Sequence, residues 1–134
     1  LVNVEQVMEA PVFVTQHETL SQALQKMEAH GYAHAITLVN DEHQPIGYVS
    51  KGLASTTQGL CGEHHFGLKS LVNVHDDLRK VASKMFTHDT TWMPCVDDNG
   101  HMVGHITQRG VTHYLGATYH KDGVEPQPQH LKLA

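Results

Sequence analysis

The sequence has little of what marks several large functional classes. Only 9 of its 134 residues are Lys or Arg, against 14 Asp and Glu, and the formal net charge is −5. Nucleic acids and anionic lipid surfaces attract dense positive charge, so neither is an expected partner. No apolar run approaches the roughly 20 residues that a helix needs to cross a bilayer. We therefore expect no direct membrane insertion.

Cysteine is equally scarce. Cys61 and Cys95 stand singly, without the spacing of a zinc knuckle or a disulfide framework, which favours a reducing cytoplasm. The 13 histidines form no compact ligand set, so no metal site is expected, although their titration near neutral pH leaves proton sensing open. No nucleophile elbow or phosphate loop is present. The sequence predicts a protein that is not an enzyme.

The two ends of the chain resemble those of an excised fragment. Leu1 is not an initiator Met, and no basic segment of a signal peptide follows it. We expect residues 118–134 to form a disordered tail, because this end is polar and interrupted by proline. Its last three residues, Lys132 to Ala134, resemble a vector-derived junction.

An internal repeat organises the residues between these ends. Residues 14–50 align with residues 72–107 at a displacement of about 58 residues, which falls to about 57 after one deletion. The identical pairs are Val14/Val72, His17/His75, Leu20/Leu78, Lys26/Lys84, Met27/Met85, His30/His88, Val39/Val96, Asp41/Asp98 and Gly47/Gly104. The same order of structural signals surrounds these pairs, so we interpret the chain as a tandem duplication.

Each copy predicts a strand, a helix and a hairpin, followed by a short helix. Apolar residues recur at helical spacing in both copies; they are Leu20, Ala23, Leu24 and Met27, then Leu78, Val81, Ala82 and Met85. Thr19 and Gln22 form a capping box before the first helix, and Gly31 ends it. Val111, Tyr114 and Leu115 predict the closing helix of the second copy.

Extended segments flank these helices. They are residues 12–15, 35–39 and 46–50 in the first copy and residues 71–74, 92–96 and 102–107 in the second. The second hairpin turns at Asn99-Gly100, whose residues both tolerate positive φ. We expect an α+β fold of two β-α-β-β-α repeats related by pseudo-twofold symmetry. The first domain is placed at residues 1–58, a linker at 59–70 and the second domain at 71–117.

This arrangement resembles a tandem pair of CBS domains, a Bateman module. The resemblance is carried by residues 7–12, 19–30 and 45–50 in the first copy and by residues 93–100 and 102–107 in the second. Residues 47–50 followed by 57–60, together with residues 104–111, are similar to the C-terminal CBS pair of bacterial glycine betaine/proline importer ATPase subunits.

The resemblance implies a ligand cleft between the two copies. In the family, apolar residues surround an adenine base, while a Gly-φ-φ-Ser/Thr-x-x-Asp motif offers a hydroxyl to phosphate and a carboxylate to ribose. The matching positions are Val12, Ala35, Ile36, Ser50, Leu53, Val72, Met93, Pro94, Thr107 and Gly110. Leu53 and Gly110 replace the carboxylates, which removes hydrogen bonds worth about 1.5 to 3 kcal/mol each and argues against tight AMP or ATP binding.

Several interpretations of this cleft stay open. Ser50 and Thr107 can cap the helices that follow them without any ligand. The cleft can hold an adenine nucleotide, a cyclic dinucleotide without ribose contacts, or no ligand, and no cofactor is certain. Pro94 either lines the cleft or marks an edge strand.

For the whole protein, the resemblance implies a non-catalytic regulatory module. It would belong to a glycine betaine/proline-type ABC importer ATPase, be cytoplasmic and peripheral to the inner membrane, and modulate osmolyte uptake in response to ionic strength or a nucleotide. Its expected partners are a second copy, stacked through helix faces that include Tyr114 and Leu115, the ATPase domain of the same chain and the permease. The alternatives are a dimerisation scaffold with vestigial clefts, or an adenosine-nucleotide sensor attached to another enzyme, channel or transporter.

Overall fold

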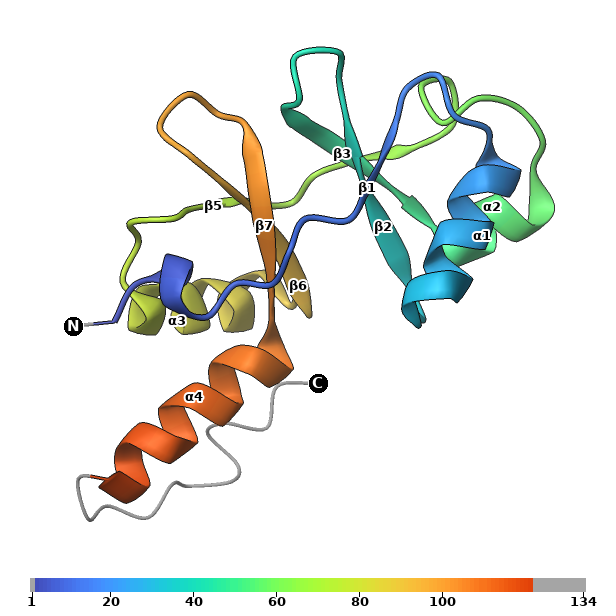
Figure 1. Cartoon of the computed structure of the whole chain (residues 1–134). Coiled ribbons are helices and arrows are strands. Elements are labelled where there is room, and N and C mark those ends of the chain that lie inside the picture. The colour runs from blue at the N-terminus through green and yellow to red at the C-terminus, as the bar shows by residue number, and fades with distance from the viewer. Residues whose placement is uncertain (1, 122–134) are drawn as a thin grey trace. The chain divides into compact units, whose positions relative to one another are not determined.

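The computed structural model describes residues 2–121, and side chains as far as residue 116. Its elements follow one another along the chain as drawn in Figure 1: η1 (Val4–Gln6), β1 (Phe13–Thr15), α1 (Leu20–His30), β2 (Ala35–Val39), β3 (Pro45–Ser50), α2 (Lys51–Thr56), β4 (Phe66–Gly67), β5 (Val72–Asn73), α3 (Leu78–His88), β6 (Trp92–Val96), β7 (Met102–Thr107) and α4 (Gln108–Lys121). The predicted α+β repeats are confirmed, since both copies run strand, helix, two strands and helix.

The chain divides into two compact units. Among the described residues, the first-repeat unit comprises residues 11–68 and 98–102, and the second-repeat unit comprises residues 2–10, 69–97 and 103–121. Each unit has a sheet and an apolar core of its own. The duplication seen in the sequence therefore corresponds to two separately packed bodies.

In the first-repeat unit, four strands lie in the order β1-β2-β3-β4. β1 pairs with β2 in parallel, and β2 pairs with β3 in antiparallel orientation. Figure 1 shows α1 and α2 side by side. The core beneath them contains Leu20, Ala23 and Met27 of α1, at the helical spacing that predicted this face.

The second-repeat unit repeats this plan with three strands in the order β5-β6-β7. Leu78, Val81 and Met85 of α3 enter its core, as their spacing predicted. Val111 and Leu115 of α4 lie in the same core. Leu115 therefore packs within its own unit, and the stacking of a second copy on this helix stays a prediction.

A lysine contact recurs at the same place in both copies. Lys26 Nζ donates to the carbonyl of Phe13 at 2.8 Å. Lys84 Nζ donates to the carbonyl of Leu71 at 2.7 Å. In each copy the main helix is thus tied to the first extended segment, which explains why lysine is among the identical residues of the repeat.

In each copy, the segment that precedes the first strand pairs with a strand of the other copy. Before β1, Glu9 N donates to His105 O at 2.8 Å and His105 N donates to Glu9 O at 3.1 Å, against β7 of the second-repeat unit. Before β5, β4 pairs with β3 of the first-repeat unit through Gly47 and Gly67. Each copy thus contributes its leading segment to the sheet of the other copy.

This exchange changes the expected domain boundaries. Residues 1–10, expected in the first domain, pack in the second-repeat unit, where Val4 is fully buried. The expected linker at residues 59–70 contains β4 and the buried Cys61 and therefore belongs largely to the first-repeat unit. α4 continues to Lys121, into the expected tail, while residues 122–134 lie outside the described residues.

Two local expectations also differ from the structure. Pro94 lies in β6, which is the central strand of its sheet and not an edge strand. The pairing of β6 with β5 runs through Cys95 and Val96, so it does not use Pro94. In the second hairpin, Gly100 has φ of 82° but Asn99 is not among the residues with positive φ.

Candidate functional site

The two motif hydroxyls cap helices. Ser50 Oγ accepts a hydrogen bond from Leu53 N at 3.1 Å at the start of α2. Thr107 Oγ1 accepts from Gly110 N at 3.0 Å at the start of α4. Both geometries are those of an N-cap, in which a side-chain oxygen satisfies a backbone N–H that has no partner within its helix. The capping interpretation is therefore confirmed for both hydroxyls.

The two positions of the missing carboxylates are half-buried. Leu53 supplies its backbone N–H to Ser50, and Gly110 supplies its own to Thr107. A Cβ atom at Gly110 would lie 3.3 Å from Thr107 Oγ1, which is a tight approach. Neither position offers a charged group to a ribose, and the second has little room for a longer side chain.

The apolar site candidates fall into two sets, one in each unit. In the first-repeat unit, Val12 and Ala35 are half-buried and Ile36 is buried. In the second-repeat unit, Val72, Met93 and Pro94 are buried. Ile36, Val72 and Met93 belong to the cores of their units, so packing accounts for their apolar character. Their role as ligand contacts stays a prediction.

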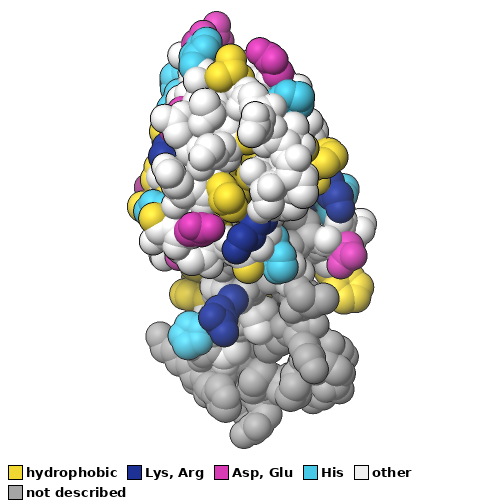
Figure 2. Space-filling view, turned by 90° about the vertical axis from the view of Figure 1, so that its right-hand side faces the viewer, with side chains coloured by type: hydrophobic (Ala, Val, Ile, Leu, Met, Phe, Trp, Pro, Cys, Tyr) yellow, Lys and Arg dark blue, Asp and Glu magenta, His cyan; other side chains and the backbone are white. Residues whose placement is uncertain are grey.

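Two of the histidines lie close to a carboxylate. His17 Nε2 and Asp41 Oδ1 lie 2.8 Å apart on the surface, and His105 Nε2 lies 3.6 Å from Glu9 Oε2 in the second-repeat unit. Within the described part of the chain, no group of three or more His, Cys, Asp or Glu side chains is placed to hold a metal ion. Figure 2 shows histidine and charged side chains distributed over the face that it presents.

Both cysteines are buried, and neither forms a disulfide. Burial raises the pKa of Cys61 to about 11, with a smaller contribution from the charge of Glu18. Burial also raises the pKa of Cys95 to about 12, assisted by Asp76. Because the thiolate is the reactive form, both side chains are protonated and unreactive at neutral pH.

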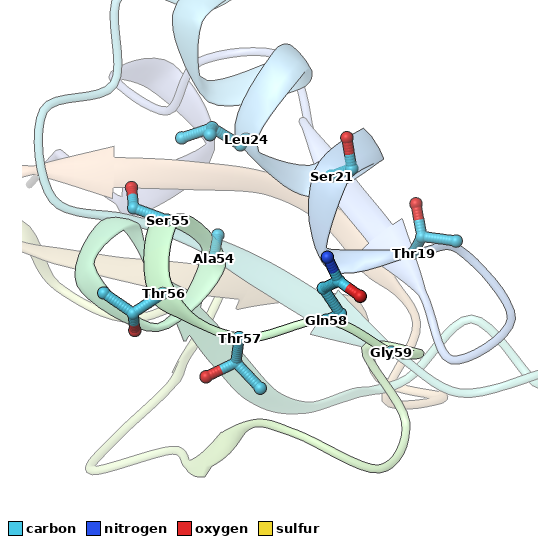
Figure 3. A pocket seen from close by; sticks show the side chains of 9 residues that line it. All are labelled: Thr19, Ser21, Leu24, Ala54, Ser55, Thr56, Thr57, Gln58 and Gly59. Carbon is cyan, nitrogen blue, oxygen red and sulfur yellow. The ribbon is translucent and has the colours of Figure 1, made fainter.

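A hollow of about 500 Å³ lies between α1 and α2 in the first-repeat unit (Figure 3). It is lined by Thr19, Ser21, Leu24, Ala54, Ser55, Thr56, Thr57, Gln58 and Gly59. None of these residues is among the predicted site positions. The polar sequence from Ser55 to Gly59 suggests only a linker, and the hollow depends on how α1 and α2 pack together. We call it the α1–α2 hollow.

No helix within residues 2–121 combines the length and the apolar character that a membrane span requires.

Known proteins resemble this chain in sequence and in fold. The osmoprotectant import ATP-binding protein OsmV of Salmonella typhimurium is 32% identical over 98 residues, which cover 73% of this chain and 25% of that protein. The chain thus spans about a quarter of this relative's length.

Among solved structures, the CBS domains of a transcriptional regulator from Streptococcus pneumoniae match with a TM-score of 0.78 at 18% identity, covering 84% of this chain and 98% of that one. CBSX2 in complex with AMP matches with a TM-score of 0.74 at 18% identity, covering 90% and 99%. At these identities the likeness shows the fold. The family model of the CBS domain matches residues 4–52 and 71–117. The chain therefore belongs to the CBS domain family, whose members are generally regulatory and not catalytic.

Proposed function

We propose that this chain is the regulatory segment of an osmoprotectant ABC importer and adjusts solute uptake to the ionic strength around it. The observation that carries the proposal is the 32% identity with OsmV over 98 residues. That relative is an osmoprotectant import ATP-binding protein, so the same host places this segment at the cytoplasmic face of a membrane. Its partners are then the ATPase domain, the permease and a second copy of the module.

The two missing carboxylates favour ionic strength over a nucleotide as the signal. Leu53 and Gly110 stand where the family motif has an Asp, so neither position offers a carboxylate to a ribose. A nucleotide would therefore lack charge-assisted hydrogen bonds worth about 1.5 to 3 kcal/mol each. The chain carries a net charge of −5, and 0.1 M salt largely screens the repulsion between exposed charges that are more than about 10 Å apart.

The competing proposal is that the chain senses a nucleotide, and it is supported by the fold's similarity to CBSX2, which was solved in complex with AMP. A thermal-unfolding panel with AMP, ATP and cyclic di-AMP, at low and high potassium chloride, separates the two. A nucleotide present at 100 times its dissociation constant would stabilise the chain by about 2.7 kcal/mol. We expect a shift with salt and none with nucleotides, while a shift with one nucleotide would replace ionic strength as the signal.

The importer itself provides the second test. Deleting residues 1–121 from the gene that encodes them should leave osmoprotectant uptake active but no longer dependent on added potassium chloride. Sorbitol at equal osmolality is the control, because it changes water activity without changing ionic strength. Uptake that keeps its salt dependence after the deletion would refute the proposal.

A further inference from the structure

The α1–α2 hollow has a chemistry of its own. Five of the nine residues that line it carry hydroxyl groups, Gln58 carries an amide, and Leu24 and Ala54 supply an apolar surface. None of the nine is charged or aromatic. The volume of about 500 Å³ lies within the range of small-molecule sites. Such a lining suits an uncharged molecule that has both polar groups and an apolar face.

Two of the five hydroxyls that line the hollow are left with acceptor capacity only. Ser55 Oγ donates its proton to Lys51 O at 2.7 Å, and Thr56 Oγ1 donates to Gly52 O at 2.8 Å. Both hydroxyl oxygens therefore keep lone pairs but have committed their protons. α2 ends at Thr56, and the carbonyl of Leu53 accepts from Thr57 N, so the carbonyls left without a helical N–H are those of Ala54, Ser55 and Thr56. A ligand rich in O–H donors would match these acceptors.

Backbone bonds fix the walls of the hollow. Leu20 N donates to Gly59 O at 2.9 Å, and Thr57 N donates to Leu53 O at 3.0 Å. Cys61, two residues beyond Gly59, is buried in the core of the unit. The segment that leaves α2 is thus held against the start of α1, which lowers the entropic cost of binding.

The second copy of the repeat lacks this arrangement. The positions equivalent to Ala54, Thr57 and Gln58 are occupied by Val111, Tyr114 and Leu115. There α4 continues through all three positions, and Val111 and Leu115 are buried in the core with Tyr114 packed against it. In the first copy, α2 stops after six residues, the small Ala54 stands in place of Val111, and the polar Thr57 and Gln58 stand in place of Tyr114 and Leu115. The duplicated fold is therefore filled by apolar side chains in one copy and lined by polar groups in the other.

We propose that the α1–α2 hollow binds a neutral polyhydroxylated molecule, a sugar or a polyol. Its hydroxyls donate to Ser55, to Thr56 and to the free carbonyls at the end of α2, and its C–H face rests on Leu24 and Ala54. Gln58 can both donate to and accept from the ligand. A betaine has no hydrogen-bond donor for these acceptors, and the lining offers neither a charged nor an aromatic side chain to its charged groups, so we expect it not to bind here.

The test is a titration of the whole 134-residue chain followed by ¹H–¹⁵N NMR, with trehalose as the probe and glycine betaine at equal osmolality as the comparator. Localised spectra are needed because excluded solutes stabilise any folded protein without binding. Trehalose should shift the amides of Ser21, Thr57 and Gly59 in a saturable manner. The equivalent amides of the second copy, Arg79, Tyr114 and Gly116, should not respond.

Two matched variants locate the site. Gln58→Leu places a leucine where the second copy has Leu115 and should weaken trehalose binding at least about tenfold, the effect of 1.4 kcal/mol. Gln25→Leu makes the same chemical change at an exposed position of α1 outside the hollow and should bind as the original chain does. If Gln58→Leu does not fold, Thr57→Val carries the same test.

Three results would overturn the proposal. They are shifts spread evenly over the chain without saturation, equal responses to trehalose and glycine betaine, and equal binding by the Gln58→Leu and Gln25→Leu variants.

Discussion

At the scale of single residues, the same hydroxyl can be explained by folding or by ligand binding, and the sequence alone does not choose. Ser50 and Thr107 were found from their motif, and the capping alternative was visible because each precedes a helix pattern. The distances to Leu53 N and Gly110 N show the capping role, while ligand binding by the same hydroxyls stays a prediction. The lining of the α1–α2 hollow could not be predicted in this way, because its residues carry no motif and meet only through packing.

If Ser50 is primarily a cap, its loss should cost stability without any ligand present. Ser50→Ala should lower the free energy of unfolding by about 1 kcal/mol, because Leu53 N then loses its acceptor. Ser83→Ala, at an exposed interior position of α3, is the control and should cause no loss, since alanine favours a helix. Urea unfolding measures both. Equal stability of Ser50→Ala and the original chain would contradict the capping role.

At the scale of elements, the two copies use different residues at two equivalent turns, one after the main helix and one in the hairpin. In each copy a left-handed residue follows the main helix: Gly31, with φ of 70°, follows α1, and Asp89, with φ of 48°, follows α3. The hairpin turn also has a left-handed residue, His43 with φ of 62° in the first copy and Gly100 with φ of 82° in the second. The glycines were predictable from sequence, but the other two residues were not, because Asp and His occupy many other conformations.

Because one copy has glycine and the other aspartate at this left-handed position, substitutions at the two sites should have opposite effects on stability. Asp89→Gly should raise the free energy of unfolding by about 0.5 kcal/mol, because relief of left-handed strain outweighs the added entropy of the unfolded chain. Gly31→Ala should lower it by about 1 kcal/mol; a Cβ there meets nothing within 4 Å, so the cost is that of backbone conformation alone. Thermal unfolding compares the two. A destabilised Asp89→Gly variant would show that the aspartate side chain stabilises the fold by another interaction.

At the scale of the whole molecule, the duplication was predictable and the exchange of leading segments was not. Identical residues at a constant displacement revealed the two copies, and helical spacing placed both cores. The pairing of β7 with residue 9 and of β3 with β4 leaves no such periodic signal. The sequence feature that corresponds to this pairing is the identical pair Gly47/Gly104. At Gly104 the segment around Glu9 approaches so closely that a Cβ atom would lie 2.7 Å from Glu9 O. A glycine that is identical in both copies of a repeat can therefore indicate a strand on which another segment packs closely.

The exchange makes the first ten residues a structural part of the second-repeat unit. Val4 is fully buried in that core, Val4 N donates to Asp76 O at 3.0 Å, and Leu78 N donates to Val2 O at 3.0 Å. Val4→Ala should therefore lower stability by about 2 kcal/mol, whereas Glu5→Ala, at an exposed neighbouring position, should change it little.

Deletion of residues 1–10 extends this test to the whole segment. Hydrogen exchange followed by mass spectrometry should show lost protection in α3 and β7, where the segment packs and pairs, and much smaller changes in β1, β2 and α1. Because the strand edge at His105 and the core around Val4 are both uncovered, the loss should exceed that of Val4→Ala. Equal loss in both units would show that the segment stabilises the chain as a whole. Unchanged protection of β7 would show that the second-repeat unit folds without residues 1–10, which would contradict the structural role inferred for this segment.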